Sequence, residues 1–175
     1  MTGDVKIRMA DLKRYTIAAL MDNEAGVLSQ IAHLFSRKGY NIETIAAGWT
    51  EDPNVTRLTI EILSDDARVK LLCNQLRKLV PIRSVKLLND NAVRRELVLI
   101  KVQAENRDIR GEIIQIGNIF RASIIDITPE TITLSLIGDE TKTAAFEDLL
   151  REFKIIELAR TGIVAIERGT DTILN

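Results

Sequence analysis

The strongest constraint on the fold of this chain is an order of segments that occurs twice along its 175 residues. Short apolar runs typical of strands alternate with stretches whose apolar side chains recur every three or four positions, as on one face of a helix. In the first half, the predicted strands cover residues 15–21, 41–47, 55–63 and 82–88. Predicted helices lie between Gly26 and Gly39 and between Asp65 and Pro81. This order predicts a ferredoxin-like unit, in which two helices cover one face of an antiparallel sheet.

The second half repeats this order after a polar, turn-prone linker at residues 89–91. Its predicted strands cover residues 95–102, 124–128, 131–137 and 155–166. A shift of 85 residues aligns identical residues of two predicted helices: Gly26 with Gly111, Gln30 with Gln115, Ile31 with Ile116 and Phe35 with Phe120. Amphipathic helices share apolar spacing by necessity, so the repeated element order carries more weight than these identities. The sequence predicts an α+β fold of two tandem ferredoxin-like βαββαβ domains, at residues 12–89 and 93–169.

The composition of the chain argues against nucleic acid and membranes as partners and against a secreted protein. The 24 Lys and Arg residues are balanced by 25 Asp and Glu residues, and a net charge of -1 gives no overall basic field for nucleic acid. The longest apolar runs, such as residues 97–100, are far shorter than the roughly 20 residues of a membrane-spanning helix. Cys73 is the single cysteine, so no internal disulfide can form, and no early stretch resembles a signal peptide. We therefore expect a cytoplasmic protein without a nucleic-acid or membrane partner.

A search for catalytic chemistry finds no convergent set of residues. His33 is the only histidine, and it lies in a predicted helix without an orienting acid. Cys73 has no second cysteine or suitable histidine for a zinc site, and a buried structural thiol is the better interpretation. The carboxylates at residues 51–52 and 65–66 suit a turn and a helix cap. No glycine-rich nucleotide motif is present, so we predict no catalytic residue, no metal ligand and no enzymatic activity.

One stretch, Asp22–Gly26, suggests a ligand because it joins a predicted buried strand to a helix. Unpaired amides at a helix start, together with the helix dipole, favour a carboxylate. Gly26 permits close approach to the backbone, and the Asn23 side chain can both donate and accept, which matches the two charged groups of a free amino acid. Asn41, after the glycine that ends the helix, adds a second amide. These are also ordinary turn residues, and spacing alone slightly favours an empty turn.

Several motifs together carry a resemblance to a known family. Residues 23–28, 34–42 and 57–60, which read NEAGVL, LFSRKGYNI and RLTI, look like the ACT domain of the acetolactate synthase small (regulatory) subunit. Residues 95–102, 119–126 and 159–162 resemble the C-terminal domain of that family. The match covers roughly residues 15–169, and its motifs follow the family's order. Ala25 departs from the pattern, since many ACT loops carry proline there.

The resemblance implies a site and a set of partners. The first domain would bind valine, or leucine or isoleucine, for feedback inhibition of branched-chain amino acid biosynthesis. Carried over by motif position, the effector-binding residues are Asn23, Ala25, Gly26, Val27 and Leu28 of one chain, with Asn41 and Ile42 of its neighbour. Such a site needs a homodimer, and pairing of two sheets would also cover edge strands that are otherwise open.

The second domain would help to engage and activate the catalytic large subunit of acetolactate synthase. Thiamine diphosphate, magnesium and FAD are expected only in that partner, and no cofactor is expected in this chain. Two other classes stay open at this point. One is a stand-alone ACT-domain regulator that responds to an amino acid, although a DNA-binding version should carry a basic recognition helix. The other is a small enzyme, which should offer converging polar groups.

Overall fold

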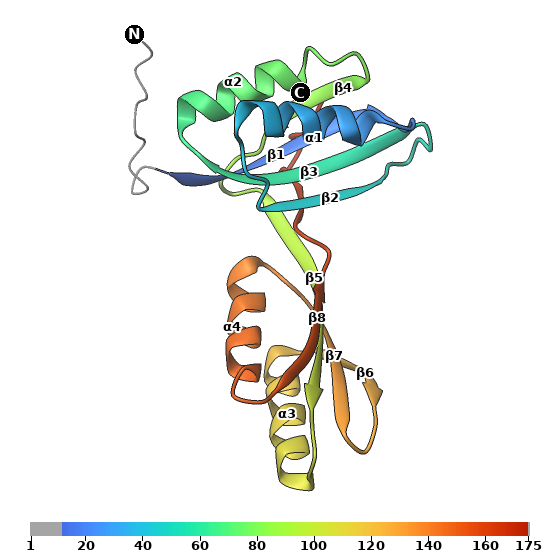
Figure 1. The fold of residues 1–175 in the computed structure, drawn as a ribbon, viewed down its shortest axis with the longest axis vertical. Helices are drawn as coiled ribbons and strands as arrows, with labels where there is room; N and C mark the ends of the chain where they lie inside the picture. Colours follow the sequence, from blue (N-terminus) through green and yellow to red (C-terminus); the bar gives the residue numbers. More distant parts are fainter. Residues whose placement is uncertain (1–11, 175) are drawn as a thin grey trace. The chain divides into compact units, whose positions relative to one another are not determined.

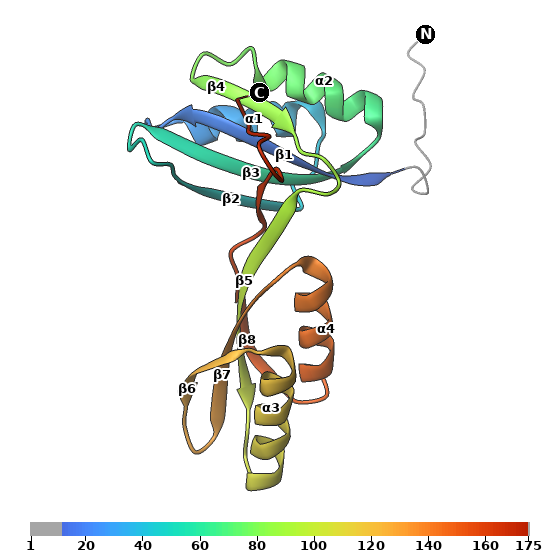
Figure 2. The ribbon, with the colours of Figure 1, turned by 180° about the vertical axis from the view of Figure 1, so that it is seen from behind.

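A computed structural model describes residues 12–174, and their contacts form two compact units (Figures 1 and 2). The first unit extends to residue 93 and includes residues 165–174; the second covers residues 94–164. The first unit contains β1 (Lys13–Asp22), α1 (Val27–Lys38), β2 (Thr44–Trp49), β3 (Val55–Ser64), α2 (Asp66–Leu76) and β4 (Ile82–Leu87). The predicted order of elements is confirmed for this half of the chain.

The first unit is built on one antiparallel sheet with the strand order β2-β3-β1-β4. The two central strands pair along their whole length, from Lys13 opposite Ser64 to Asp22 opposite Val55. β2 pairs only with β3 and β4 only with β1, so these two strands form the edges of the sheet. At one end of the sheet, β1 ends where β3 and β4 begin. The loop that enters α1 therefore lies beside the β2–β3 hairpin tip.

Both helices of the first unit cover the same face of its sheet (Figure 1). Each helix buries apolar side chains at spacings of three and four, as the sequence predicts. From α1 these are Val27, Ile31, Leu34 and Phe35, and from α2 they are Val69, Leu72, Cys73 and Leu76. They pack on Ile17, Leu58, Ile60 and Ile62 of the central strands. Burial of each large side chain is worth roughly 1.5–3 kcal/mol, which makes this layer the main stabilising element of the unit.

The opposite face of this sheet carries the C-terminal segment, residues 165–174 (Figure 2). The Arg57 guanidinium donates to the Ala165 carbonyl (2.8 Å), and the Ser84 hydroxyl donates to the Ile173 carbonyl (2.8 Å). Glu61 on this face is only 1% exposed. Its carboxylate accepts hydrogen bonds from Arg14 (3.3 Å) and from the Thr16 hydroxyl. A buried charge needs such partners, so the part of this face around Glu61 is a packed polar layer.

The second unit repeats the architecture of the first. Its elements are β5 (Val93–Gln103), α3 (Arg107–Phe120), β6 (Ser123–Ile127), β7 (Thr131–Gly138), α4 (Glu140–Leu150) and β8 (Ile155–Arg160). The sheet order β6-β7-β5-β8 matches the order of the first unit, and a short ninth strand, β9 (Val164–Ile166), pairs with β5. The core gathers Val98, Ile100, Ile113, Leu134, Phe146 and Leu150. The predicted α+β fold of two ferredoxin-like repeats is therefore confirmed.

The prediction of one strand over residues 155–166 is wrong. β8 ends at Arg160, and the chain turns at Gly162, whose φ of 75° lies outside extended backbone. Residues 165–169, which the predicted second domain (93–169) includes, have their contacts with the first unit in the structure. There the Glu167 carboxylate accepts hydrogen bonds from the backbone and side-chain amides of Asn89, at 3.1 Å each. Local periodicity carries no information on such a distant contact.

Two glycines of α3 give a matched test of core packing in the second unit. A Cβ on Gly117 would lie 2.8 Å from Leu134 Cδ2, whereas a Cβ on Gly111 would meet nothing within 4 Å. Gly111→Ala should stabilise the second unit by about 0.5–1 kcal/mol through helix propensity. Gly117→Ala should be less stable than Gly111→Ala by at least about 1 kcal/mol, because the buried Leu134 must move. Urea unfolding of both variants measures the difference, and equal free energies of unfolding would contradict it.

Candidate effector-binding site

The loop between β1 and α1 is fixed at its first two residues. The Asp22 backbone N–H donates to the Pro81 carbonyl, and the Asn23 backbone N–H donates to the Asn54 carbonyl, both at 2.9 Å. These bonds attach the loop on one side to the start of β4 and on the other to the hairpin tip. Glu24, which follows, is exposed. The loop is therefore held at its base by two backbone hydrogen bonds and is exposed between this base and the start of the helix.

Asn23 is tied to the hairpin tip by its side chain as well. Its amide nitrogen donates to the Pro53 carbonyl (3.0 Å), and its amide oxygen accepts from the Thr56 hydroxyl (3.2 Å). The sequence predicts this side chain as a ligand contact, and the structure adds a positioning role for it. A primary amide has two donor hydrogens and two acceptor lone pairs, so these two bonds leave capacity for a bound ligand.

The start of α1 differs from the starts of the other three helices that residues 12–174 form. In α2, α3 and α4, the side chains of Asp65, Asn106 and Asp139 cap the first turn by accepting from a backbone amide. The N-cap of α1 is Gly26, which has no side chain to do this, and no acidic residue lies in the first turn. The amides and the positive end of the α1 dipole thus face outward, in an arrangement suited to an anion.

The remaining predicted loop residues differ in their exposure at this helix start. Ala25 and Gly26 are exposed, and the space where a Gly26 Cβ would lie is open. Leu28 is 47% exposed, which leaves an apolar side chain beside the helix start. The Val27 side chain belongs to the core, so only the backbone of Val27 can contact a ligand. The loop therefore offers amides, one carboxamide and one exposed apolar side chain.

Asn41 and Ile42 lie at the far end of α1 from this loop. The helix has 12 residues, so its two ends are about 18 Å apart. Asn41 is exposed and donates to the Glu43 carboxylate (2.7 Å), while Ile42 packs partly against the core. Both precede β2, which begins at Thr44, and the predicted strand start at residue 41 is three residues too early. Within one chain, the structure does not bring the two halves of the predicted site together.

The two edges of the first sheet differ in character. β2 has the sequence TIAAGW, without a charged residue, and its Ile45 and Trp49 are 44% and 79% exposed. β4 instead carries Arg83 and Lys86, and the Lys86 ammonium donates to the Thr172 carbonyl of the C-terminal segment (2.7 Å). Charged side chains and a covering segment protect a sheet edge against pairing. Of these two edges, β2 is the one open to another strand.

Among residues 12–174, no three His, Cys, Asp or Glu side chains lie in a group that could hold a metal ion. His33 is exposed. Cys73 is buried, and burial raises the pKa of its thiol. No helix in this part of the chain has the length and apolar character to cross a membrane.

Comparison with known proteins first gives the class. Residues 17–84 match the family model "AHAS small subunit-like ACT domain". Residues 95–169 match the model "Small subunit of acetolactate synthase". The first unit, with its glycine-led α1 and its ferredoxin-like sheet, is thus an ACT domain followed by a second domain of related topology.

Whole-chain relatives then give the family. A probable acetolactate synthase small subunit of Archaeoglobus fulgidus is 44% identical over 156 residues, which cover 89% of this chain and 98% of the relative. A probable small subunit of Methanothermobacter thermautotrophicus is also 44% identical, over 90% of this chain and 95% of the relative. The crystal structure of the Thermotoga maritima acetolactate synthase small subunit is similar with a TM-score of 0.85 and 36% identity, over 91% and 99% of the two chains. The chain belongs to the acetolactate synthase small-subunit family.

The contacts that position the loop were not predictable from sequence motifs. The predicted elements place Pro53 and Asn54 between two strands and Thr56 within the second strand, but they give no link to Asn23 about 30 residues earlier. A correct β1–β3 register would have given this link, because it places Asp22 opposite Val55. The usable signal was therefore strand pairing, and no local pattern contained it.

The left-handed backbone at Gly26 gives a stability prediction. Its φ is 90°, and a non-glycine residue there costs about 1–2 kcal/mol. Gly26→Ala should destabilise the first unit by about this amount through backbone strain alone, because a Cβ would meet no atom within 4 Å. Gly48→Ala is the matched control, since its Cβ is also in open space but its φ is not positive. Equal thermal stability of the two variants would contradict this explanation.

The buried Cys73 gives a second, chemical prediction. Burial restricts access to the thiol and raises its pKa, so little reactive thiolate forms at pH 8. Reaction with a disulfide reagent such as DTNB should be at least about tenfold slower in the native chain than in urea. A native rate equal to the unfolded rate would show that the α2 core opens readily.

Proposed function

We propose that this chain is the regulatory subunit of an acetolactate synthase and binds a branched-chain amino acid through the start of α1. The observation that carries the proposal is the uncapped α1 N-terminus in a domain of the ACT type. Membership in a family whose relatives are called small subunits supports a regulatory role beside a catalytic large subunit. The proposal gives this chain no catalytic step of its own.

The chemistry of an amino acid fits the groups at this loop. The ligand carboxylate would accept from the outward amides of the first turn of α1, where the helix dipole favours a negative charge. The ammonium group would donate to the Asn23 side-chain oxygen, which accepts one hydrogen bond already and has a second lone pair. Leu28 lies beside the helix start and would contact an apolar side chain such as that of valine, leucine or isoleucine.

A homodimer would complete this site through the open β2 edge. Antiparallel pairing of two β2 strands around a two-fold axis places the start of one strand beside the end of the other. Asn41 and Ile42 precede the start of β2, and the α1 N-terminus lies at the end where β2 finishes. The two-fold axis therefore brings Asn41 and Ile42 of one chain toward Gly26 of its partner. This supports the expected composite site.

Regulation then follows from binding at a shared interface. An amino acid that contacts both chains stabilises one arrangement of the dimer, and the bound population shifts toward that arrangement. We propose that this arrangement inhibits the catalytic large subunit, and that the chain without effector activates it. Thiamine diphosphate, magnesium and FAD belong to that partner in this proposal, and the complex is cytoplasmic.

Calorimetric titration of the purified chain with valine, leucine and isoleucine tests the effector site. At least one of the three should bind, and Asn23→Ala should weaken binding by about 10-fold to 100-fold through loss of a hydrogen bond to a charged group. Asn74→Ala, which removes an exposed amide on α2, is the control and should bind as the wild type does. Absence of heat and of thermal stabilisation with all three amino acids would reject the sensor.

Co-purification tests the partner separately. Expressed with an acetolactate synthase large subunit, the chain should co-elute with it and raise its activity, and added effector should reduce that activity. A chain that binds an amino acid but never associates with the large subunit would favour a stand-alone ACT-domain regulator instead.

A further inference from the structure

Arg83 connects the two segments that hold the candidate effector loop. Its Nε lies 2.6 Å from the Asp22 carboxylate, at the base of the loop. Its Nη1 lies 3.7 Å from the Asp52 carboxylate, in the hairpin tip. Arg83 belongs to β4, so one guanidinium joins three segments that are far apart in the sequence.

The hairpin tip that Arg83 reaches is itself ordered by Asp52. The Asp52 carboxylate accepts from the backbone N–H (2.9 Å) and the side-chain amide (3.0 Å) of Asn54. The Asn54 carbonyl in turn accepts from the Asn23 backbone amide. Arg83 is thus linked to the loop by two routes, directly through Asp22 and indirectly through Asp52, Asn54 and Asn23.

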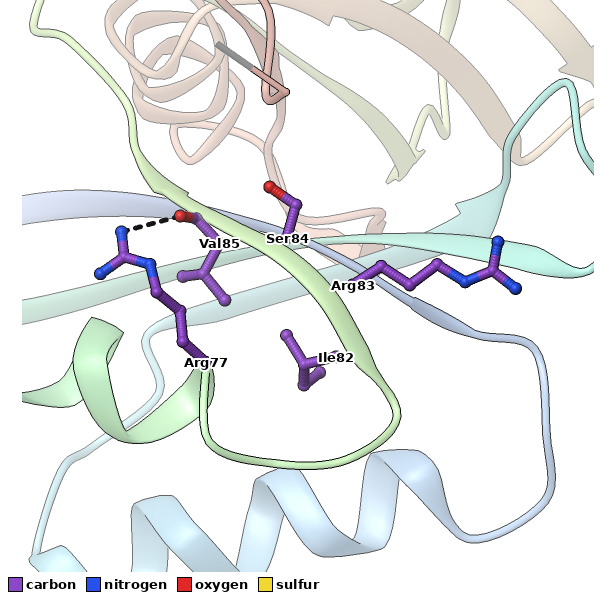
Figure 3. Close-up of a pocket in the computed structure, with 5 residues that line it drawn as sticks. All are labelled: Arg77, Ile82, Arg83, Ser84 and Val85. Carbon is purple, nitrogen blue, oxygen red and sulfur yellow. Dashed lines mark hydrogen bonds between the residues drawn. The ribbon is translucent and has the colours of Figure 1, made fainter.

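A second arginine that lines the same pocket as Arg83 does not reach the loop. Figure 3 shows Arg77 and Arg83 beside this pocket, with their guanidinium groups extending in opposite directions. Arg77 donates to the Val85 carbonyl (2.9 Å) and to the Asn74 side chain (2.8 Å). The pocket itself is lined by these two arginines together with Ile82, Ser84 and Val85. Arg77 therefore provides a matched charge without the connection to the loop.

We propose that Arg83 is a positioning residue of the effector site, which fixes the base of the Asp22–Gly26 loop and so the direction of the α1 amides. This inference rests on the proposed function of that loop. The ion pairs of Arg83 are partly exposed, with side-chain exposures of 46% for Arg83 and 32% for Asp22. Exposed pairs contribute little to global stability. The effect of Arg83 is expected in ligand affinity and not in the stability of the unit.

The test compares Arg83→Gln, Arg83→Lys and Arg77→Gln by calorimetric titration with valine, leucine and isoleucine. If the binding-competent loop falls to about a tenth to a third of the population, affinity for the effector falls about 3-fold to 10-fold in Arg83→Gln. Arg83→Lys keeps the charge but cannot span both carboxylates, so its affinity should lie between those of Arg83→Gln and the wild type. Arg77→Gln should bind as the wild type does, and all three melting temperatures should agree closely.

Two further variants keep the test decisive. The first is Asp52→Asn, which removes the charge but keeps an oxygen for Asn54, and the second combines Asp52→Asn with Arg83→Gln. Asp52→Asn should weaken binding more in the wild-type background than in the Arg83→Gln background, because the two residues act together. If the wild type binds none of the three amino acids, the proposed function itself is rejected. If the wild type binds but Arg83→Gln binds equally well, the positioning role alone is overturned. Equal losses of affinity in Arg83→Gln and Arg77→Gln would overturn it too, because a general charge effect would then suffice.

Discussion

The pairing of β1 with β3 is the interaction on which the rest of the first domain depends. Its ten-residue register runs from Lys13 opposite Ser64 to Asp22 opposite Val55. This register places Ile17 beside Ile60 under the helices, and it brings the end of β1 to the hairpin tip. There, the backbone amide of Asn23 donates to the Asn54 carbonyl, and this hydrogen bond fixes the residues that precede the start of α1. A shift of this pairing by one residue would move every side chain of the strand to the other face of the sheet, and both the core and the candidate site would be lost.

The two domains share one architecture, but their first helices start differently. α1 and α3 occupy equivalent places after the first strand of their sheets, and both bury an apolar face. The Asn106 side chain caps α3 by accepting from the Ile109 amide (2.9 Å), so one amide of that first turn is satisfied by a side chain of the chain itself. Gly26 leaves α1 without a side-chain cap, and in the proposed function the carboxylate of the effector would accept from the amides of this open turn. The residue at the N-cap is thus the local difference between the two helix starts.

The sequence predicts most of the fold because periodicity and local capping are short-range signals. The spacing of Val27, Ile31 and Leu34 predicts α1, and Asp65 caps α2 as expected. What sequence patterns miss depends on distant contacts: Glu167 binds Asn89, so the C-terminal segment returns to the first domain. The sequence predicts a helix that starts at the candidate loop, as the structure has it, but the contacts of that loop with Thr56 and Arg83 depend on the strand register. The roles of Asn41 and Ile42 remain a prediction, because one chain alone keeps them at the opposite end of α1.

The central claim is that each effector site is shared between two chains, and mixed dimers test it most directly. One population carries Asn23→Ala and the other Asn41→Ala, and each alone should bind the effector weakly. After the two are mixed and allowed to exchange subunits, each heterodimer contains one site with both residues intact and one with both altered. Random exchange should therefore restore wild-type affinity to about a quarter of all sites. No recovery of high-affinity binding, despite demonstrated exchange, would place the site within a single chain and contradict the account.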